Sequence, residues 1–314
     1  SWSIHAAWPC EPSPSPSPCA TASPTQLHVP PSAALQLPGA AVAPGATVGT
    51  GSGPGAGDRA RLVYSHVDSL TETVERLMAM RDDSDVLYSW NDLGSFGAIG
   101  AGFIVSGRFL QDTSRLKPAP RYASVSPGKG QWPFNAFNRA GLTVVNGAFG
   151  RLNGGLVKER VVSDFEVHFP FASRESYFHA YGPSGFIEHQ VLLPHEAVRS
   201  YIGEFEKLLR RAGIPVGLAT FKIFDGARKL LWYSGPGISF AVHVPVSAAA
   251  LAFLAQVDSM DIAHGAAANV IKDARLSHDI VRRQYPEFDT LRDRLAAHDP
   301  ERMFESALSR RIGL

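Results

Sequence analysis

The sequence predicts an α+β fold: an antiparallel sheet with helices on one face, built from ferredoxin-like β-α-β-β-α-β units, with a disordered N-terminal tail and a helical C-terminal tail. Three observations favour it. Residues 181–272 show one regular order of strand, helix, strand, strand, helix and strand. Residues 59–109 begin that order again, which suggests an internal duplication. Residues 1–57 hold 11 of the 23 prolines and one charged side chain, Glu11, a composition that cannot bury a core.

The strand predicted at 186–193 alternates apolar and polar side chains, as a half-buried strand does. The alternation places Glu188 and Gln190 on one face of the sheet and His189 and Val191 on the other. Later parts of the same unit add two cations, Lys222 and Lys272. Polar side chains gathered on one sheet face predict a floor for a polar ligand.

The rest of this unit has clear boundaries. Apolar residues recur every three or four positions from Val198 to Ala212, which indicates an amphipathic helix that Gly213 ends. Strands are expected at 216–224 and 238–246, a second helix at 248–257 and a short strand at 266–271. Two β-α-β units joined in this way form an antiparallel sheet with both helices on one face. The other face is then free for a ligand or a partner domain.

Residues 59–180 show the first part of the same pattern. Strands are expected at 61–67, 86–91 and 102–109, and Ser69 with Glu72 has the spacing of a capping box at a helix start. Between 112 and 165, prolines and poor periodicity predict a long loop, followed by an extended stretch at 164–171. Residues 276–314 are expected to form two or three helices separated by Pro286 and Pro300.

Composition excludes several classes of protein. The chain has 314 residues, 45% of them hydrophobic, and a formal net charge of +1, which fits a soluble globular protein and not a nucleic-acid-binding one. No apolar run is long enough for a transmembrane segment. Both cysteines, Cys10 and Cys19, lie in the tail, so the folded part offers no thiol nucleophile. The compartment is not indicated, since a cytoplasmic protein and one peripheral to a membrane fit equally.

No local motif marks a catalytic or metal centre. The glycines at 51–57 lie in the tail, and those at 94–102 lie between two expected strands. A phosphate-binding loop instead needs a strand before it and a helix after it. The histidines are scattered without ligand spacing, so no metal site is expected. Serine, histidine and aspartate are present, but in no arrangement that marks a catalytic triad.

Five segments occur in an order that resembles the FAD-linked oxidases of the vanillyl-alcohol-oxidase type, and within them the enzymes that oxidise polyprenyl-phosphate-linked ribose. The segments at 180–198, 221–226, 238–246, 269–275 and 296–314 read AYGPSGFIEHQVLLPHEAV, FKIFDG, ISFAVHVPV, NVIKDAR and AAHDPERMFESALSRRIGL. YSWND at 88–92 resembles the first strand of the family's substrate domain. The resemblance covers residues 60–314 and is strongest at 180–200 and 266–314.

The resemblance implies FAD as cofactor and removal of a hydride from a sugar carbinol, such as the ribose 2-hydroxyl of a polyprenyl-phosphoribose. It implies a catalytic set of Lys272 beside flavin and substrate, Lys222 at a sugar hydroxyl or phosphate, and Gln190 at the substrate. Cations near the ring would stabilise reduced, anionic flavin. Further positions are implied for substrate binding (Glu188, His168, His179, Phe224, Ser239 and Trp90) and for the cofactor (Lys272, Asn269 and Ala241).

The sequence departs from the family at several of these positions. Glu188 stands where close members have glutamine, and His168 and His179 replace a tyrosine and an arginine of the phosphosugar site. Ala241 and Asn269 replace a cysteine and a tyrosine. These departures weigh against the lipid-linked ribose more than against the reaction. From the residues alone, a plainer interpretation stays open, because a lysine on a strand is usually a surface side chain and an aromatic residue is usually core.

The resemblance divides the chain into a disordered tail (1–58), a substrate-binding or cap domain (59–266) and a C-terminal segment (267–314) that would complete an FAD-binding domain. A flavin domain is expected before residue 60, where the tail stands, so the chain alone is expected to bind FAD poorly or not at all. Expected partners are a sugar or lipid-linked sugar, and either a partner reductase or a separate flavin domain. The alternatives are a sugar-1,4-lactone or alditol oxidase and, in another class, a non-catalytic sugar-binding remnant.

Overall fold

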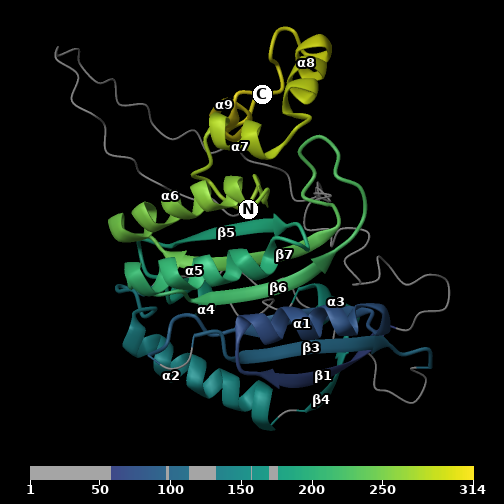
Figure 1. Ribbon diagram of the computed structural model, residues 1–314, viewed down its shortest axis with the longest axis vertical. Coiled ribbons are helices and arrows are strands. Elements are labelled where there is room, and N and C mark those ends of the chain that lie inside the picture. Colours follow the sequence, from purple (N-terminus) through teal and green to yellow (C-terminus); the bar gives the residue numbers. More distant parts are fainter. Residues whose placement is uncertain (1–57, 97–98, 113–131, 157, 170–175) are drawn as a thin grey trace. The chain divides into compact units, whose positions relative to one another are not determined.

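The computed structural model describes residues 58–96, 99–112, 132–156, 158–169 and 176–314, all within one compact unit; the predicted N-terminal tail lies outside them. Their strands form a single 8-stranded sheet in the order β4-β1-β3-β2-β6-β7-β5-β8, and every neighbouring pair is antiparallel (Figure 1). The predicted α+β class is therefore confirmed. The strands are β1 (Arg59–Val67), β2 (Val86–Asn91), β3 (Gly102–Phe109), β4 (Glu159–Ser163), β5 (Phe186–Leu193), β6 (Leu218–Phe224), β7 (Gly237–Pro245) and β8 (Ala267–Ala268).

Helices connect these strands and form the C-terminal part of the chain. None of those in the described residues is long and apolar enough to cross a membrane. They are α1 (Leu70–Met80), α2 (Arg139–Gly150), α3 (Asp164–His168), α4 (Ser176–His179), α5 (Val198–Ala212), α6 (Ala248–Ala263), α7 (His278–Gln284), α8 (Phe288–His298) and α9 (Ala307–Ile312), with a 3₁₀ turn at Arg81–Asp83 and a π-helical stretch at Arg151–Leu156.

The sheet consists of two halves with the same topology. The first half runs β1, α1, β2, β3, α2, β4 and the second runs β5, α5, β6, β7, α6, β8. In each half the fourth strand lies beside the first, the first beside the third and the third beside the second, as in a ferredoxin-like unit. The two halves join where β2 pairs with β6, with Tyr88 opposite Lys222. The suggested duplication therefore extends over both halves.

The helix ends follow from local chemistry. Ser69 Oγ accepts a hydrogen bond from the Glu72 backbone N–H at 3.1 Å, and the Glu72 carboxylate accepts a second backbone hydrogen bond at 2.7 Å. The first bond satisfies a donor that the first turn of α1 leaves free, and the second ties Asp68, just before the cap, to the helix. Gly213 ends α5 with a φ of 65°, a conformation that costs glycine little. Ser247 caps α6 by accepting from the Ala250 N–H at 3.1 Å.

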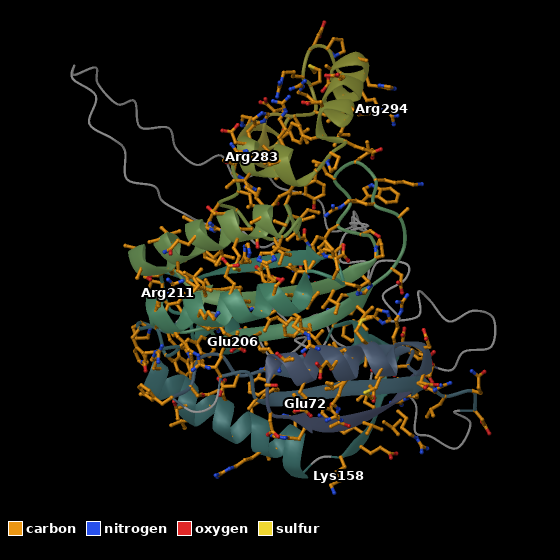
Figure 2. The ribbon with its side chains drawn as sticks, viewed as in Figure 1. Glu72, Lys158, Glu206, Arg211, Arg283 and Arg294 are labelled. Carbon is orange, nitrogen blue, oxygen red and sulfur yellow. The ribbon has the colours of Figure 1, made fainter. Side chains whose placement is uncertain are left out.

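The helix side of the sheet, covered by α1, α5 and α6, holds the main core. Phe221 and Phe240 stack there with ring centroids 4.5 Å apart, and Phe205 of α5 meets Phe240 edge-on at 5.0 Å. Burial of such rings removes large apolar areas from water and stabilises the fold. Glu206 and Arg211, labelled on α5 in Figure 2, are not among its buried residues.

The second helix of the first half lies against the other face. Phe149 of α2 meets Trp90 edge-on at 5.1 Å and lies 5.8 Å from Phe103. The Trp90 and Phe103 rings belong to the face opposite α1, and Val167 of α3 packs in the same cluster. The prediction of both helices on one face, made for the second half, is confirmed. In the first half, aromatic side chains of β2 and β3 give α2 an apolar surface on the opposite face.

Two predictions between 112 and 171 are wrong. The expected long loop contains α2, the π-helical stretch and β4, although residues 113–131 lie outside the described part. Three glycines and the β-branched residues 143–145 obscure α2 in the sequence, but burial of Leu142 and Asn146 anchors it. The stretch expected to be extended from 164 begins instead with α3, because Ser163 and Glu166 form a capping box.

Elsewhere the elements match the predictions closely. Strands β2, β3 and β5 have the expected bounds, and the C-terminal residues form helices, as expected. Helix α6 continues past Val257 to Ala263. The strand predicted at 266–271 is reduced to β8, because the Asn269 carbonyl accepts a hydrogen bond from the Lys272 N–H at 3.0 Å and turns the chain.

Candidate functional site

The face of the second half-sheet that α5 and α6 leave free carries a row of polar side chains, here called the polar face. The strand register places Glu188 opposite His243 and Lys222 opposite Ser239, and opposite residues in a ladder share a face. Its polar members are Glu188 and Gln190 of β5, Thr220 and Lys222 of β6, and Ser239 and His243 of β7.

Glu188 lies between two nitrogen-bearing side chains. Its Oε2 is 3.3 Å from Lys272 Nζ and 3.5 Å from His243 Nε2. Burial by itself would raise the pKa of Glu188, but the hydrogen bonds and charges of His243 and Lys272 outweigh it and lower the pKa to about 2. The carboxylate is therefore ionised at neutral pH. Lys272 reaches it from the turn after β8, with a side chain that is 46% exposed.

Two tyrosines continue this line of contacts. Tyr177 Oη lies 2.9 Å from His243 Nδ1 and 2.8 Å from Tyr181 Oη. Burial raises the pKa of both tyrosines, so both hydroxyls keep their protons. The ring of His243 thus contacts the Glu188 carboxylate through Nε2 and the Tyr177 hydroxyl through Nδ1. The hydroxyl orients the ring, and the ring in turn holds Glu188.

Gln190 is oriented by a second set of hydrogen bonds. Asn269 Nδ2 donates to Gln190 Oε1 at 2.9 Å, and Gln190 Nε2 donates to Ser239 Oγ at 3.2 Å. Tyr233 Oη donates to the same serine hydroxyl at 2.9 Å. The Asn269 backbone N–H also donates to the Gln190 carbonyl at 2.7 Å. These bonds bring two strands, a loop and a turn together beside Glu188.

Lys222 stands beside this cluster on β6. Its side chain is open to solvent, yet enough protein surrounds it that desolvation lowers the pKa of its amine. The charge of Glu188 opposes this shift, and the charge of Lys272 adds to it. Exposure and desolvation are compatible here, because water reaches the Lys222 side chain while protein lies on several sides of it. Lys222 therefore offers an accessible amine that holds its proton less firmly than an ordinary lysine.

The turn after β8 is tied to β5 through both faces of the sheet. Lys272 contacts Glu188 on the polar face, while Asp273 lies 3.1 Å from His189 Nδ1 on the helix side. Asp261 of α6 lies 3.1 Å from His189 Nε2, close enough for an ion pair but without the alignment of a hydrogen bond. Desolvation lowers the pKa of His189, but the two carboxylates outweigh it and raise the pKa to about 10. Buried charges therefore fix the turn that carries Lys272.

One group of side chains on the helix side has the spacing of metal ligands. Ligand atoms of His189, Asp258 and Asp261 lie within 4.8 Å of one another. Arg275, however, donates to both carboxylate oxygens of Asp258, at 2.9 and 3.0 Å, and also to Asp273. Because the guanidinium already balances these carboxylates, the geometry favours a buried ion-pair network over a metal centre.

The structure brings part of the predicted set of site residues together. Direct contacts join Lys272 to Glu188, and Gln190 to Asn269 and Ser239. Two further predicted residues, Lys222 and Ala241, share the polar face, where Ala241 lies opposite Gln190. The catalytic, substrate-binding and cofactor-binding roles of all these residues stay predictions.

The other predicted site residues lie outside this cluster. Trp90 is buried in the aromatic cluster of the first half. Phe224 shares the face of Lys222 but is buried against Leu192 and Tyr233. His168 ends α3, and its Nδ1 lies 2.9 Å from the carbonyl oxygen of residue 164. His179 ends α4. In the described residues, no side-chain contact links either histidine to Glu188 or its partners.

Four residues that hold the site were not selected from the sequence: His243, Tyr177, Tyr181 and Tyr233. His243 had a usable signal, because alternation along 238–246 places it on the same face as Ser239. Tyr177 had none, because its contact with His243 joins positions 66 residues apart in the chain.

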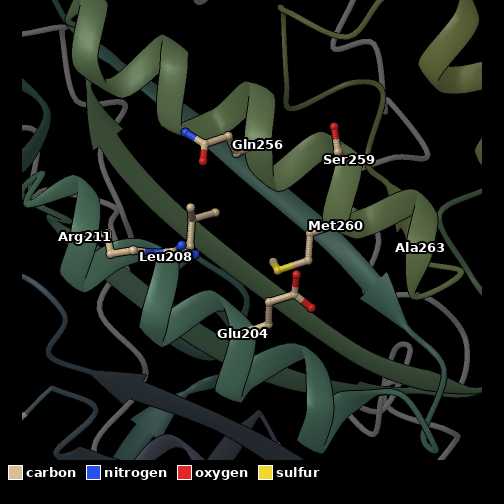
Figure 3. Close-up of a pocket in the computed structure, with 7 residues that line it drawn as sticks. All are labelled: Glu204, Leu208, Arg211, Gln256, Ser259, Met260 and Ala263. Atoms are coloured by element: carbon tan, nitrogen blue, oxygen red, sulfur yellow. The ribbon is translucent and has the colours of Figure 1, made fainter.

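A groove of about 240 Å³ lies between α5 and α6 on the helix side (Figure 3). None of the predicted site residues lines it, so this hollow and the polar face are separate features. Its lining residues are Glu204, Leu208, Arg211, Gln256, Ser259, Met260 and Ala263.

Comparison with known proteins gives a partial sequence match. No protein-family model matches the chain. The chain is 27% identical over 164 residues to decaprenylphosphoryl-beta-D-ribose oxidase from Mycolicibacterium smegmatis, a match that covers 51% of this chain and 35% of the relative. Among solved structures, a variant of berberine bridge enzyme aligns with a TM-score of 0.40 and 12% identity, over 81% of this chain and 55% of that one. A likeness of that size does not by itself establish a shared fold.

The sequence match bears directly on the resemblance described first. It spans only about a third of the length of the curated relative. The resemblance to the FAD-linked oxidases that was inferred from the ordered segments is confirmed by this partial match to decaprenylphosphoryl-beta-D-ribose oxidase.

Proposed function

We propose that this chain is part of an FAD-linked oxidoreductase that oxidises a carbinol of a sugar, and that the polar face is the floor on which the sugar lies. The observation that carries the proposal is the contact of 3.3 Å between Lys272 and Glu188 on the free side of the sheet. It joins a cation and a carboxylate that could accept a hydrogen bond from a hydroxyl, and the two come from segments that both resemble the oxidases. The similarity to decaprenylphosphoryl-beta-D-ribose oxidase supports the reaction class.

The chemistry of the polar face fits the ring of FAD. Lys272 is about half exposed and Lys222 is open to solvent on the same side. Cations in such positions favour the negative charge that reduction places on a flavin ring. When bound, FAD would accept the hydride. In the described residues no strand is followed by a glycine loop and a helix that could hold a pyrophosphate, so another part of the protein would hold the rest of FAD.

Each side chain of the cluster has a distinct part in this proposal. Glu188 accepts a hydrogen bond from a sugar hydroxyl, and Gln190, oriented by Asn269, positions the ring of the sugar. Lys272 supplies positive charge beside the flavin. Lys222 takes up the proton that the hydroxyl loses as the carbinol is oxidised, a role that its lowered pKa favours.

The domain division is part of the same proposal. Residues 59–266 would form the substrate-binding domain, and residues 267–314 would complete an FAD-binding domain that another segment or chain supplies. Two finer substrates fit this reaction class: the 2-hydroxyl of a polyprenyl-phosphoribose, as in the relative, and a sugar-1,4-lactone or alditol. A partner reductase or a separate flavin domain is the proposed protein partner.

Two measurements test this function. The purified chain is expected to show no stoichiometric flavin absorbance. Joined to the part of the Mycolicibacterium smegmatis relative that this chain does not cover, it is expected to bind FAD and to lose flavin absorbance when a sugar is added without oxygen. A panel of aldopentoses, aldonolactones, alditols and polyprenyl-phosphoribose identifies the substrate. A joined protein that binds FAD but is reduced by none of them contradicts the proposal.

A non-catalytic sugar-binding module is the second candidate. The hydrogen-bonded polar network without a pyrophosphate loop in the described residues favours it. Sugar binding to the joined protein without any flavin reduction would support this candidate over the first.

A further inference from the structure

We propose that Glu188 sets the charge of the ligand: it makes the polar face select an uncharged, hydroxyl-rich sugar or polyol and disfavour phosphorylated or carboxylated ones. The inference rests on the proposed function in one respect, namely that the polar face is the substrate floor. It goes further because it favours the uncharged lactones and alditols over the phosphate-bearing polyprenyl-phosphoribose, a choice that the reaction type leaves open.

The first step concerns the cations that an anionic ligand would need. The polar face offers two amines, but Lys272 is already paired with Glu188 at 3.3 Å. An anion would have to compete with that carboxylate for the same amine. The second amine, Lys222, lies where desolvation lowers its pKa, although the charge of Glu188 opposes that shift. An anion on the polar face would therefore meet one amine that is already paired and one whose charged form is disfavoured by desolvation.

The second step concerns repulsion. Glu188 remains ionised at neutral pH and is only 19% exposed, so solvent screens its charge incompletely. A phosphate or carboxylate placed on the polar face would lie close to a like charge. An uncharged hydroxyl would instead donate a hydrogen bond to the carboxylate, the stronger, charge-assisted type. In the described residues Oε2 carries both ion-pair contacts of Glu188, and Oε1 has no described partner.

The third step concerns the position of the carboxylate. His243 Nε2 lies 3.5 Å from Glu188, and His243 is held in turn by Tyr177 at 2.9 Å. Lys272 approaches from the turn after β8, which Asp273 ties to the core through His189. Because both neighbours of Glu188 are themselves held, the carboxylate cannot easily turn away to admit an anion. Its charge is a fixed property of the polar face.

The test uses the full chain and two probes that differ by one group, D-ribose and D-ribose 5-phosphate. Dissociation constants are measured by NMR-monitored titration at equal ionic strength for the wild type, Glu188→Gln and Glu204→Gln. Glu204 lies in the groove between α5 and α6 on the helix side, so its variant makes the same change of net charge away from the polar face. Thermal unfolding of each protein shows that it is folded.

The wild type is expected to bind ribose at least as tightly as its phosphate. Glu188→Gln should reverse this order by tightening ribose 5-phosphate binding about tenfold and weakening ribose binding, since it removes the like charge and frees Lys272. Glu204→Gln should behave as the wild type. An unchanged ratio of the two affinities in Glu188→Gln, or a wild-type preference for the phosphate, overturns the inference.

A second variant covers the case in which Glu188→Gln does not fold. Glu188→Ala removes the same charge with a smaller side chain, so it should tighten ribose 5-phosphate binding about tenfold relative to ribose; an unchanged ratio of the two affinities overturns the inference. The outcomes also separate this inference from the proposed function. Ribose binding with no charge selection removes the role of Glu188 alone, whereas no binding of either probe to any of these proteins removes both.

Discussion

The two halves of the sheet share one topology but use the same face in different ways. In the first half, Phe149 of α2 and Val167 of α3 cover that face, and Trp90 stacks on Phe103 at 5.4 Å. In the second half, α6 lies on the helix side and the same face carries Glu188, Gln190, Lys222 and their partners. The placement of one helix therefore decides whether a ferredoxin-like half buries this face or leaves it for a ligand.

The comparison also shows where stability and function are separated. The second half draws its stability from the helix side, where Phe221, Phe240 and the His189 network are buried. The polar face is then free to hold charged groups that contribute little to the core. A single strand, β5, serves both purposes, because Glu188 and His189 are neighbours that face opposite ways.

The largest expected effect contrasts the same face in the two halves. Trp90→Ala should lower the free energy of unfolding by about 4 kcal/mol, because it removes a large buried ring. Lys222→Met should change it by less than about 1 kcal/mol, because this side chain is exposed. Urea unfolding followed by circular dichroism measures both. Similar losses for the two variants would show that the polar face is as structural as its counterpart.

The next effect concerns the ion network beneath the polar face. Asp273→Ala should lower the free energy of unfolding by about 3 kcal/mol, because it removes a carboxylate that balances the buried charges of both His189 and Arg275. The control is Arg199→Ala, which breaks the exposed pair with Glu75 and should cost less than about 1 kcal/mol. A loss for Asp273→Ala as small as for the control would contradict this account of how the turn is held.

The pH dependence of stability gives a smaller effect with a defined sign. The folded-state pKa of His189 is raised from 6.5 to about 10. Its contribution to stability is therefore fully present below about pH 6.5 and is lost as the pH rises toward 10. Unfolding of the wild type and His189→Gln is compared at pH 6.5 and 9.5. The difference between the two proteins should shrink at the higher pH, and a constant difference would exclude a buried imidazolium.

The smallest effect concerns the hydrogen bonds behind Glu188. Tyr177→Phe removes the hydroxyl that contacts His243 and Tyr181, and should cost about 1 to 2 kcal/mol of unfolding free energy. The same variant should loosen Glu188, which an NMR titration would detect as a rise in the pKa of its carboxyl. A carboxyl pKa that stays at about 2 would show that Lys272 and His243 hold Glu188 without the tyrosine.

The sequence was most informative where the pattern was local. Strand β5 matched because alternation along 186–193 is a property of the segment itself, and the same alternation predicted that Glu188 and Gln190 share a face. Helix α2 was missed because its glycines and β-branched residues favour other structures, and only tertiary burial of Leu142 and Asn146 outweighs that preference. Local signals thus predicted the strands better than the placement of the helices.

The site followed the same rule. The pairing of Lys272 with Glu188 could not be derived from spacing, because it joins the turn after β8 to β5 across the whole second half. Resemblance to the oxidases suggested it, whereas periodicity could not. The contact of Tyr177 with His243 depends on where α4 lies against β7, and neither periodicity nor resemblance indicated it.

The central claim, that the polar face carries the reaction, is tested most directly by two lysine substitutions in the joined protein. Lys272→Met removes the amine 3.3 Å from Glu188, and Lys207→Met removes an exposed amine on α5, on the opposite side of the sheet. Sugar-dependent flavin reduction is followed without oxygen by rapid mixing. The account predicts a rate at least about 100-fold lower for Lys272→Met, with Lys207→Met unchanged. Equal rates for the two variants would contradict it.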